Sequence, residues 1–339
     1  MGRIIAIMQV EGKRLLEAAF LSSGIKVSVL FFLLFALACD ASAQTTEPVD
    51  ETITIDTGLV DLNVSVFSRN AKTPVGELQQ KDFVVLENGE QEEISFFAAA
   101  SAPFDLVLLI DLSGSTAKKL DLIKKSARRF VEAARPTDRI GIVTFTSSAQ
   151  LISPLTSDRQ ALFERIKRIE KPTGGTSFWD SLDFVLKKVV ADASRRRAVI
   201  MMTDGVDNAL PDINGDGSAM SFDELLEEVR GSDIILLPIY LDTEKEMIEK
   251  GLATESTYVL ARQQLAQLAA ESGSIVYRAR KVEDLKGVYE QVIRDLGTVY
   301  SIGYRPKNRE RNGSWRSVTV QLVGRPDLAA RTKRGYYAR

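Results

Sequence analysis

Apolar and polar residues alternate along the first region of the chain, which spans residues 51–100. Residues 59–67 (LVDLNVSVF) alternate with the period of a half-buried strand. Asn88-Gly89 lies between the apolar runs at 84–86 and 94–97, and an Asn-Gly pair in this setting is a strong signal of a β-hairpin. The region is therefore predicted to form a small antiparallel β module.

Residues 103–297 follow a different pattern, in which apolar runs alternate with amphipathic stretches. Residues 104–110 (FDLVLLI) are mostly apolar, as expected of a strand buried on both faces of a parallel sheet. Further strands are expected at 140–145, 150–155, 198–203 and 234–241, and helices at 118–134, 159–169, 177–190, 222–230, 258–272 and 282–296. Strands that alternate with helices predict a doubly wound, Rossmann-like α/β domain.

The tail, residues 298–339, returns to β structure, with strands expected at 299–304, 315–323 and 331–337. Three strands bury little apolar surface by themselves. We therefore expect the tail to pack with residues 51–100 into one small β-sandwich-like module. The α/β domain would then be inserted between the two halves of that module.

Residues 1–43 have the pattern of an export signal. An uncharged apolar run at 27–38 is too short to cross a bilayer as a helix, basic residues precede it, and Ala41-Ser42-Ala43 follows it. We expect cleavage after Ala43 and export to the periplasm, the cell surface or the medium, with no transmembrane helix in the mature chain. A lipid anchor at Cys39 is the alternative, because residues 36–39 partly match a lipoprotein cleavage box.

The composition narrows the chemistry that the chain can perform. Of 339 residues, 45% are apolar and 27% charged, and the net charge of −2 gives no basic stripe for nucleic-acid binding. There is no histidine, which removes the commonest general base and transition-metal ligand. The single cysteine, Cys39, lies in the export signal, so an internal disulfide and Cys-rich zinc sites are excluded. A bound metal must then have oxygen ligands, which favours Mg²⁺, Ca²⁺ or Mn²⁺.

Five polar side chains are placed where ligands bind in an open α/β sheet, outside the carboxyl ends of the strands. They are Asp111, Ser113, Ser115, Thr176 and Asp204. Two carboxylates and three hydroxyls make an oxygen-only shell with a charge of −2, which suits Mg²⁺. Taken singly, each residue also fits a helix cap or a turn, but five of them on one rim favour a metal site.

This set resembles the metal-ion-dependent adhesion site of von Willebrand factor A domains. The match consists of Asp-x-Ser-x-Ser at 111–115, Gly-Gly-Thr at 174–176 and Thr-Asp-Gly at 203–205, within a resemblance over roughly residues 103–296. It implies that Ser113, Ser115 and Thr176 contact the metal directly, whereas the two aspartates hold it mostly through water. A Glu or Asp of a protein partner would complete the shell. The flanking β segments resemble those of secreted bacterial proteins that carry this domain.

A second candidate site is the acidic loop that begins at Asp212. Its first half fits the calcium-loop pattern D-x-[DN]-x-D-G, but the twelfth position is Asp223 rather than Glu, and Glu224 comes one place late. The candidate calcium ligands are Asp212, Asn214, Asp216, Ser218, Asp223 and Glu224. The alternative is an acidic, Gly-rich surface loop.

The resemblance favours an exported protein-binding or adhesion module that depends on Mg²⁺ or Mn²⁺, and not an enzyme. A Mg²⁺-dependent phosphatase of the haloacid dehalogenase type is an alternative, since it also places an Asp after a buried strand. Such an enzyme needs a second Asp where Ser113 stands, and a hydroxyl cannot perform that proton transfer near neutral pH. A structural envelope protein with a vestigial metal site is the third reading.

Overall fold

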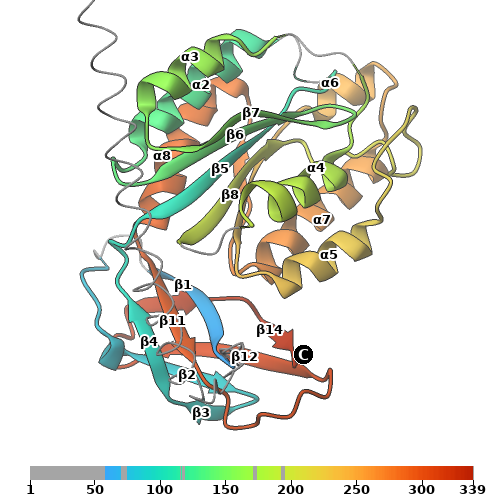
Figure 1. The fold of residues 1–339 in the computed structure, drawn as a ribbon. Helices are drawn as coiled ribbons and strands as arrows, with labels where there is room; N and C mark the ends of the chain where they lie inside the picture. Colours follow the sequence, from blue (N-terminus) through green and yellow to red (C-terminus); the bar gives the residue numbers. More distant parts are fainter. Residues whose placement is uncertain are drawn as a thin grey trace, which may run out of the picture. The chain divides into compact units, whose positions relative to one another are not determined.

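The structure is a computed structural model that describes residues 58–69, 75–114, 116, 119–170, 174–191 and 195–338. The expected export signal, Cys39 and Ser115 lie outside these residues. The described residues build three β-sheets, of which the largest forms the centre of the α/β domain (Figure 1). Within the same residues, no helix has the length and apolar character needed to cross a membrane.

The central sheet of the α/β domain has six strands among the described residues, and five of them run parallel. In order across the sheet they are β10 (Tyr277–Ala279), β9 (Ile235–Leu241), β8 (Arg196–Thr203), β5 (Phe104–Asp111), β6 (Arg139–Phe145) and β7 (Ala149–Thr156). Only β7 is antiparallel, at one edge. β5 is buried along its whole length, as its continuous apolar run predicts.

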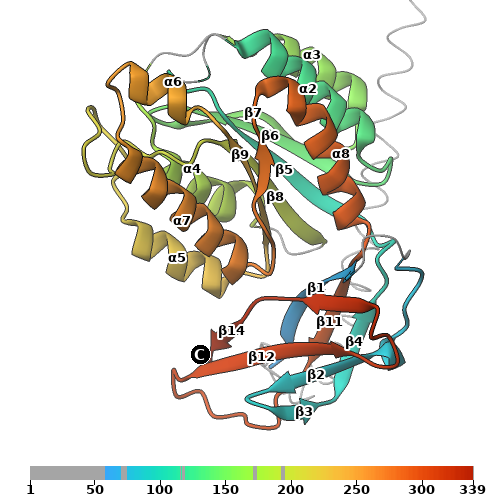
Figure 2. The same ribbon diagram turned by 180° about the vertical axis from the view of Figure 1, so that it is seen from behind.

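Helices cover both faces of this sheet (Figures 1 and 2). One face packs against α2 (Leu120–Ala133), α3 (Arg159–Lys167) and α8 (Leu285–Leu296), which follows the short 3₁₀ turn η4 (Val282–Asp284). The other face packs against α4 (Phe178–Phe184), the π-helix η3 (Val185–Val189), α5 (Phe222–Gly231) and α7 (Glu255–Glu271). The short helix α6 (Glu244–Glu249) lies between β9 and α7 in the chain. The predicted doubly wound α/β fold is confirmed.

The N-terminal and tail strands form two further four-stranded sheets. The strands of the first sheet are, in order, β13 (Leu328–Arg331), β1 (Val60–Ser68), β11 (Val299–Tyr304) and β4 (Ile94–Ala98). Those of the second are β14 (Gly335–Tyr337), β12 (Trp315–Leu322), β2 (Phe83–Glu87) and β3 (Glu90–Glu92). The 3₁₀ turn η1 (Gln80–Asp82) precedes β2. Apolar residues of both sheets share one core, which includes Val64, Ile302, Val85 and Val320. The two ends of the chain therefore form a sandwich together.

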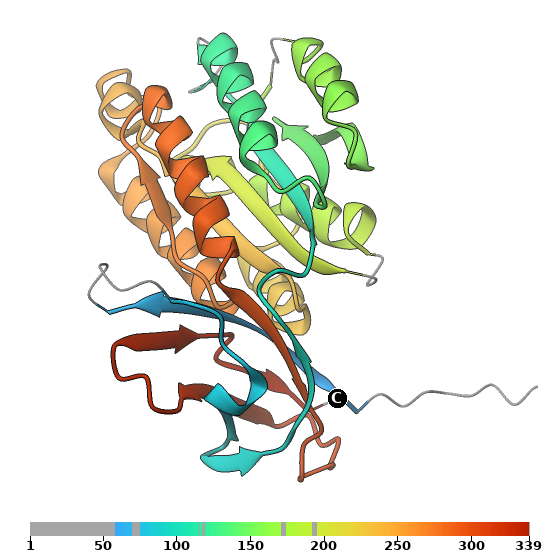
Figure 3. The ribbon, with the colours of Figure 1, turned by 90° about the vertical axis from the view of Figure 1, so that its left-hand side faces the viewer.

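Each connection between the β module and the α/β domain is short. β4 ends at Ala98 and β5 begins at Phe104, while α8 ends at Leu296 and β11 begins at Val299, so the last helix leads almost directly into a central strand of the sandwich (Figure 3). The guanidinium of Arg196 lies over the Phe104 ring, 4.0 Å from its centroid. It also donates to the carbonyls of Ala100 (3.0 Å) and Val299 (2.5 Å), so one side chain holds both connections.

Some local expectations from the sequence were wrong. Asn88 and Gly89 both have positive φ, as a tight hairpin turn requires, but the hairpin joins β2 to β3 rather than to the run at 94–97. That run forms β4 in the other sheet, because the chain changes sheets after Glu92. The single strand expected at 331–337 is two short strands in different sheets, and the short elements α6 and β10 were not anticipated.

The sandwich also buries a charged pair. Glu87 and Arg316 are 4% and 3% exposed, and their side chains are 3.1 Å apart. The hydroxyls of Tyr304 and Tyr336 each donate to Glu87 Oε2 at 2.7 Å. Each buried charge therefore depends on its partner, because an unpaired charge in a protein interior is strongly destabilising.

The first prediction tests this pair. Glu87→Gln leaves the buried Arg316 without its countercharge and should lower the free energy of unfolding by about 3 kcal/mol, measured by urea denaturation. Glu90→Gln, at an exposed position on β3 of the same hairpin, is the matched control and should change stability little. Equal stability of the two variants would contradict the assignment.

Candidate metal centre

The two candidate aspartates lie at the carboxyl ends of adjacent strands. Asp111 is the last residue of β5, and Asp204 directly follows β8, which pairs with β5 in parallel register. Both are buried, with exposed fractions of 0% and 3%. The strand order thus brings together two acidic groups that are 93 positions apart in the sequence numbering.

Each oxygen of the Asp111 carboxylate accepts a hydrogen bond. The Ser113 amide donates to Oδ1 and the Thr203 hydroxyl donates to Oδ2, both at 2.8 Å. Even so, burial and, second, the negative charge of Asp204 raise the pKa of Asp111 to about 7. Two buried carboxylates close together in this way favour a nearby cation, because it would stabilise both charged forms.

Asp204 is held by residues that the sequence reasoning missed. Thr243, just after β9, donates its hydroxyl to Asp204 Oδ2 at 2.6 Å, and Tyr258 on α7 lies 2.9 Å from the same hydroxyl. All three side chains are buried. The Thr243 and Tyr258 positions belong to no short motif, so only the fold shows that they contact this carboxylate.

Thr176 lies in the loop before α4, between two other loops. Its carbonyl accepts from the Asn208 amide at 2.9 Å, and the next amide, of Ser177, donates to Thr146 at 2.7 Å. Ser177, rather than Thr176, is the N-cap residue of α4. Gly175 is needed for this close approach, because a Cβ there would lie 2.7 Å from Asn208 Nδ2.

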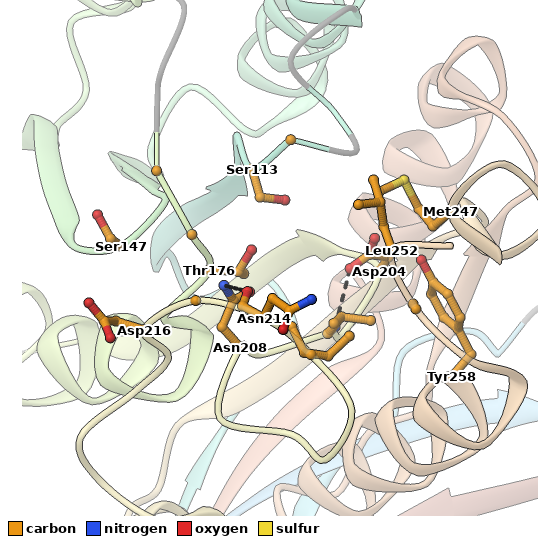
Figure 4. A pocket seen from close by; sticks show the side chains of 17 residues that line it. Ser113, Ser147, Thr176, Asp204, Asn208, Asn214, Asp216, Met247, Leu252 and Tyr258 are labelled. Atoms are coloured by element: carbon orange, nitrogen blue, oxygen red, sulfur yellow. Dashed lines mark hydrogen bonds between the residues drawn. The ribbon is translucent and has the colours of Figure 1, made fainter. Parts of the chain in front are cut away.

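A pocket of about 570 Å³ joins three of the five candidates. Ser113, Thr176 and Asp204 line it, as Figure 4 shows, whereas Asp111 is fully buried and is not among the lining residues. Ser115 lies outside the described residues. In the described part of the chain, no group of three or more His, Cys, Asp or Glu side chains could hold a metal, so any ion here depends on hydroxyl oxygens as well as the two carboxylates.

The family match agrees with this arrangement. The family model of the von Willebrand factor type A domain matches residues 105–291, more than half of the chain. The chain belongs to the von Willebrand factor type A domain family. The matched segment begins within β5 and ends within α8, so it contains all five candidate ligands of the domain.

Individual relatives are distant. An uncharacterized protein of Borreliella burgdorferi is 26% identical over 118 residues, which cover 32% of this chain and 34% of that protein. The chain spans between 16% and 61% of the length of the curated relatives it matches.

Solved structures give similarly distant matches. The von Willebrand factor domain of the type V pili tip protein Mfa5 from Porphyromonas gingivalis gives a TM-score of 0.43 at 14% identity, covering 57% of this chain and 94% of that one. Proximal thread matrix protein 1 of the mussel byssus, solved with a zinc-occupied MIDAS motif, gives 0.46 at 17% identity, covering 61% and 49%.

The von Willebrand factor A domain does not gather the candidate calcium ligands of the 212–224 loop. Ser218 donates its hydroxyl to Asp207 at 2.6 Å. Glu224 accepts from the amide and the hydroxyl of Ser221, both at 2.8 Å, and so caps helix α5. Asp212, Asp216 and Asp223 are exposed. The loop is thus organised by hydrogen bonds among its own residues and with Asp207, Asn208 and Asp180 of α4.

Asp207 is a buried carboxylate that helps to fix this loop, and sequence reasoning missed it. It is fully buried. Oδ1 accepts from the amides of Ala209 and Ser218, both at 2.9 Å, and Oδ2 accepts from the Trp179 amide at 3.0 Å as well as from the Ser218 hydroxyl. Asp207 therefore fastens the loop that lines the pocket to the start of α4, together with Asp180 of that helix, whose carboxylate accepts from the amides of Ala219 and Met220.

The second prediction concerns this anchor. Asp207→Asn replaces an accepting oxygen with an amide nitrogen and leaves the buried Trp179 amide without an acceptor. The free energy of unfolding should fall by about 2 kcal/mol, measured by chemical denaturation. Asp212→Asn, an exposed substitution in the same loop whose φ of +65° suits Asn, is the control. A loss as large in the control would contradict the role of Asp207.

Proposed function

We propose that Asp111, Ser113, Ser115, Thr176 and Asp204 hold Mg²⁺, or Mn²⁺ in its place, and that the protein is a metal-dependent protein-binding module of the adhesion type. A Glu or Asp of the partner completes the coordination shell. One observation carries the proposal: in a von Willebrand factor A domain, two buried carboxylates at adjacent strand ends lie beside a pocket lined by the Ser113 and Thr176 hydroxyls.

The hydrogen bonds of the two aspartates support the proposal that these side chains attract the cation without contacting it directly. Both oxygens of Asp111 accept from protein donors, and Asp204 accepts from Thr243 and from the Val206 amide at 3.2 Å. These donors fix the positions of both carboxylates. The two negative charges then attract a cation, while the neutral hydroxyls of the serines and Thr176 contact it directly. When bound, the cation supplies an electrophilic centre, which attracts a carboxylate from outside because few anionic ligands touch it directly.

Binding rather than catalysis is proposed because the pocket offers hydroxyl and carboxylate oxygens that suit a cation. Ser113 occupies the position at which a haloacid dehalogenase-type phosphatase needs its second aspartate. Export is part of the proposal and rests on the pattern of residues 1–43.

The third prediction tests the metal. Isothermal titration of the metal-free protein with Mn²⁺ and Mg²⁺ should show one saturable site. Ser113→Ala, which removes a direct ligand, and Asp111→Ala, which removes a buried carboxylate, should each weaken binding by about tenfold to a hundredfold, because loss of even an outer-shell group costs roughly that much.

Asp216→Asn is the matched control for this titration, since it removes an exposed carboxylate that lines the same pocket. Its affinity should equal that of the wild type. A wild type that binds neither ion, even with millimolar acetate present as a stand-in for the partner's carboxylate, would overturn the proposal.

The fourth prediction concerns the support of Asp204. Thr243→Val keeps the shape of the side chain but removes the hydroxyl between Asp204 and Tyr258, so Mn²⁺ affinity should fall by about tenfold. Thr243→Ser keeps the hydroxyl and should restore the affinity. If both variants bind Mn²⁺ equally well, Thr243 has no orienting role.

A further inference from the structure

One wall of the metal pocket is formed by the segment between Thr243 and Tyr258. This segment, residues 244–257, is here called the α6 rim. Met247, Leu252 and Ala253 of the rim line the pocket, and Figure 4 shows the first two beside Asp204 and Tyr258. Leu252 is 55% exposed, which is an unusual position for a leucine at the mouth of a polar site.

The rest of the pocket lining has a different character. The opposite side carries Ser147, Asn208, Asn214 and Asp216, together with Gly174, Gly175 and Gly215. Val206 and Ile213 also line the pocket but are partly buried against the domain core. The rim contributes Met247, which is partly exposed, and Leu252, which is exposed. An apolar group bound next to the metal would therefore find its most exposed apolar contact on the rim side.

The α6 rim is fastened to the metal centre at both of its ends. Thr243 precedes it and Tyr258 follows it, and both belong to the hydrogen-bonded chain that ends on Asp204. Glu246 of the rim pairs with Lys119, which lies shortly after the 111–115 motif, at 3.5 Å. The apolar surface is thus held in place relative to the candidate metal ligands. A polypeptide that binds to it therefore loses little binding free energy to ordering of the protein.

The charged residues of the rim do not compete for such a ligand. Glu244 pairs with Arg262 and accepts from Tyr240, and Glu246 also pairs with Lys250 at 2.5 Å. These carboxylates have basic partners within the domain, and the rim residues that line the pocket, Met247, Leu252 and Ala253, are apolar.

We propose that the α6 rim is a recognition surface for a polypeptide in which an apolar side chain lies immediately beside the metal-binding Glu or Asp. The inference rests on the proposed function, since the metal holds the acidic residue. A pocket of about 570 Å³ has the size of a ligand site for more than one side chain. An aliphatic neighbour fits Met247 and Leu252, whereas the hydroxyl-covered ring of a sugar acid would leave polar groups against them.

The test uses synthetic blocked pentapeptides with the wild-type protein loaded with Mn²⁺. The central residue is Glu and is flanked on both sides by Leu or by Ser; a third peptide has Gln between two Leu. Binding is measured from the paramagnetic broadening of the peptide proton signals. The Leu-flanked Glu peptide should bind about fivefold to tenfold more tightly than the Ser-flanked one, as expected for partial burial of one aliphatic side chain.

Leu252→Ser should remove this preference while Mn²⁺ affinity and binding of the Ser-flanked Glu peptide stay as in the wild type. Ile248→Ser is the matched control, because Ile248 is 39% exposed in the same rim but does not line the pocket. It should retain the preference.

The outcomes separate the two proposals. Equal binding of the two Glu peptides, or a preference that survives in Leu252→Ser, overturns the recognition role of the rim and leaves the metal site intact. Failure of the protein to hold Mn²⁺, or equal binding of the Gln peptide, overturns the proposed function and the rim proposal with it.

Discussion

The burial of two carboxylates at adjacent strand ends is the constraint on which this domain depends. Asp111 and Asp204 lose solvation and also repel each other, and this raises the pKa of Asp111. Their charges are tolerated because β8 contributes Thr203, β9 leads into Thr243, and the loop after β5 contributes the Ser113 amide. The hydrogen bonds that stabilise the two buried carboxylates also fix the surrounding loops and α7. The shape of the pocket therefore depends on these hydrogen bonds.

The β module solves the same problem in the opposite way. Glu87 is buried beside Arg316, a cation that the chain itself provides, and two tyrosine hydroxyls satisfy the remaining acceptor capacity. Near Asp111, by contrast, the neighbouring donors are neutral. The chain thus contains one buried carboxylate whose charge is compensated internally and, at Asp111 and Asp204, a pair of buried carboxylates for which we propose an ion from solution. This difference separates the buried ion pair from the proposed metal site.

Much of this arrangement could be predicted from the sequence, because buried parallel strands are continuous apolar runs and the polar residues after them must meet at one rim. The α/β class and the positions of Asp111 and Asp204 follow from that logic, whereas the pairing of the chain ends follows from the small apolar surface that three strands can bury. Thr243, Tyr258 and Asp207 could not be found in this way, because a single Thr, Tyr or Asp in a loop or helix carries no periodic signal. Their roles depend on tertiary contacts between segments that are distant in the chain.

The register of the sandwich has a consequence for how such a chain can be assembled. Ala98 of β4 lies opposite Ser301 of β11 in an antiparallel pair, so the residues at which the chain leaves the sandwich and returns to it are neighbours. A tight turn at that point would make β4 and β11 an ordinary hairpin. The α/β domain thus takes the place of the loop that would connect β4 and β11 in a hairpin. This position is therefore a natural junction at which recombination of the gene can add, remove or exchange a complete domain.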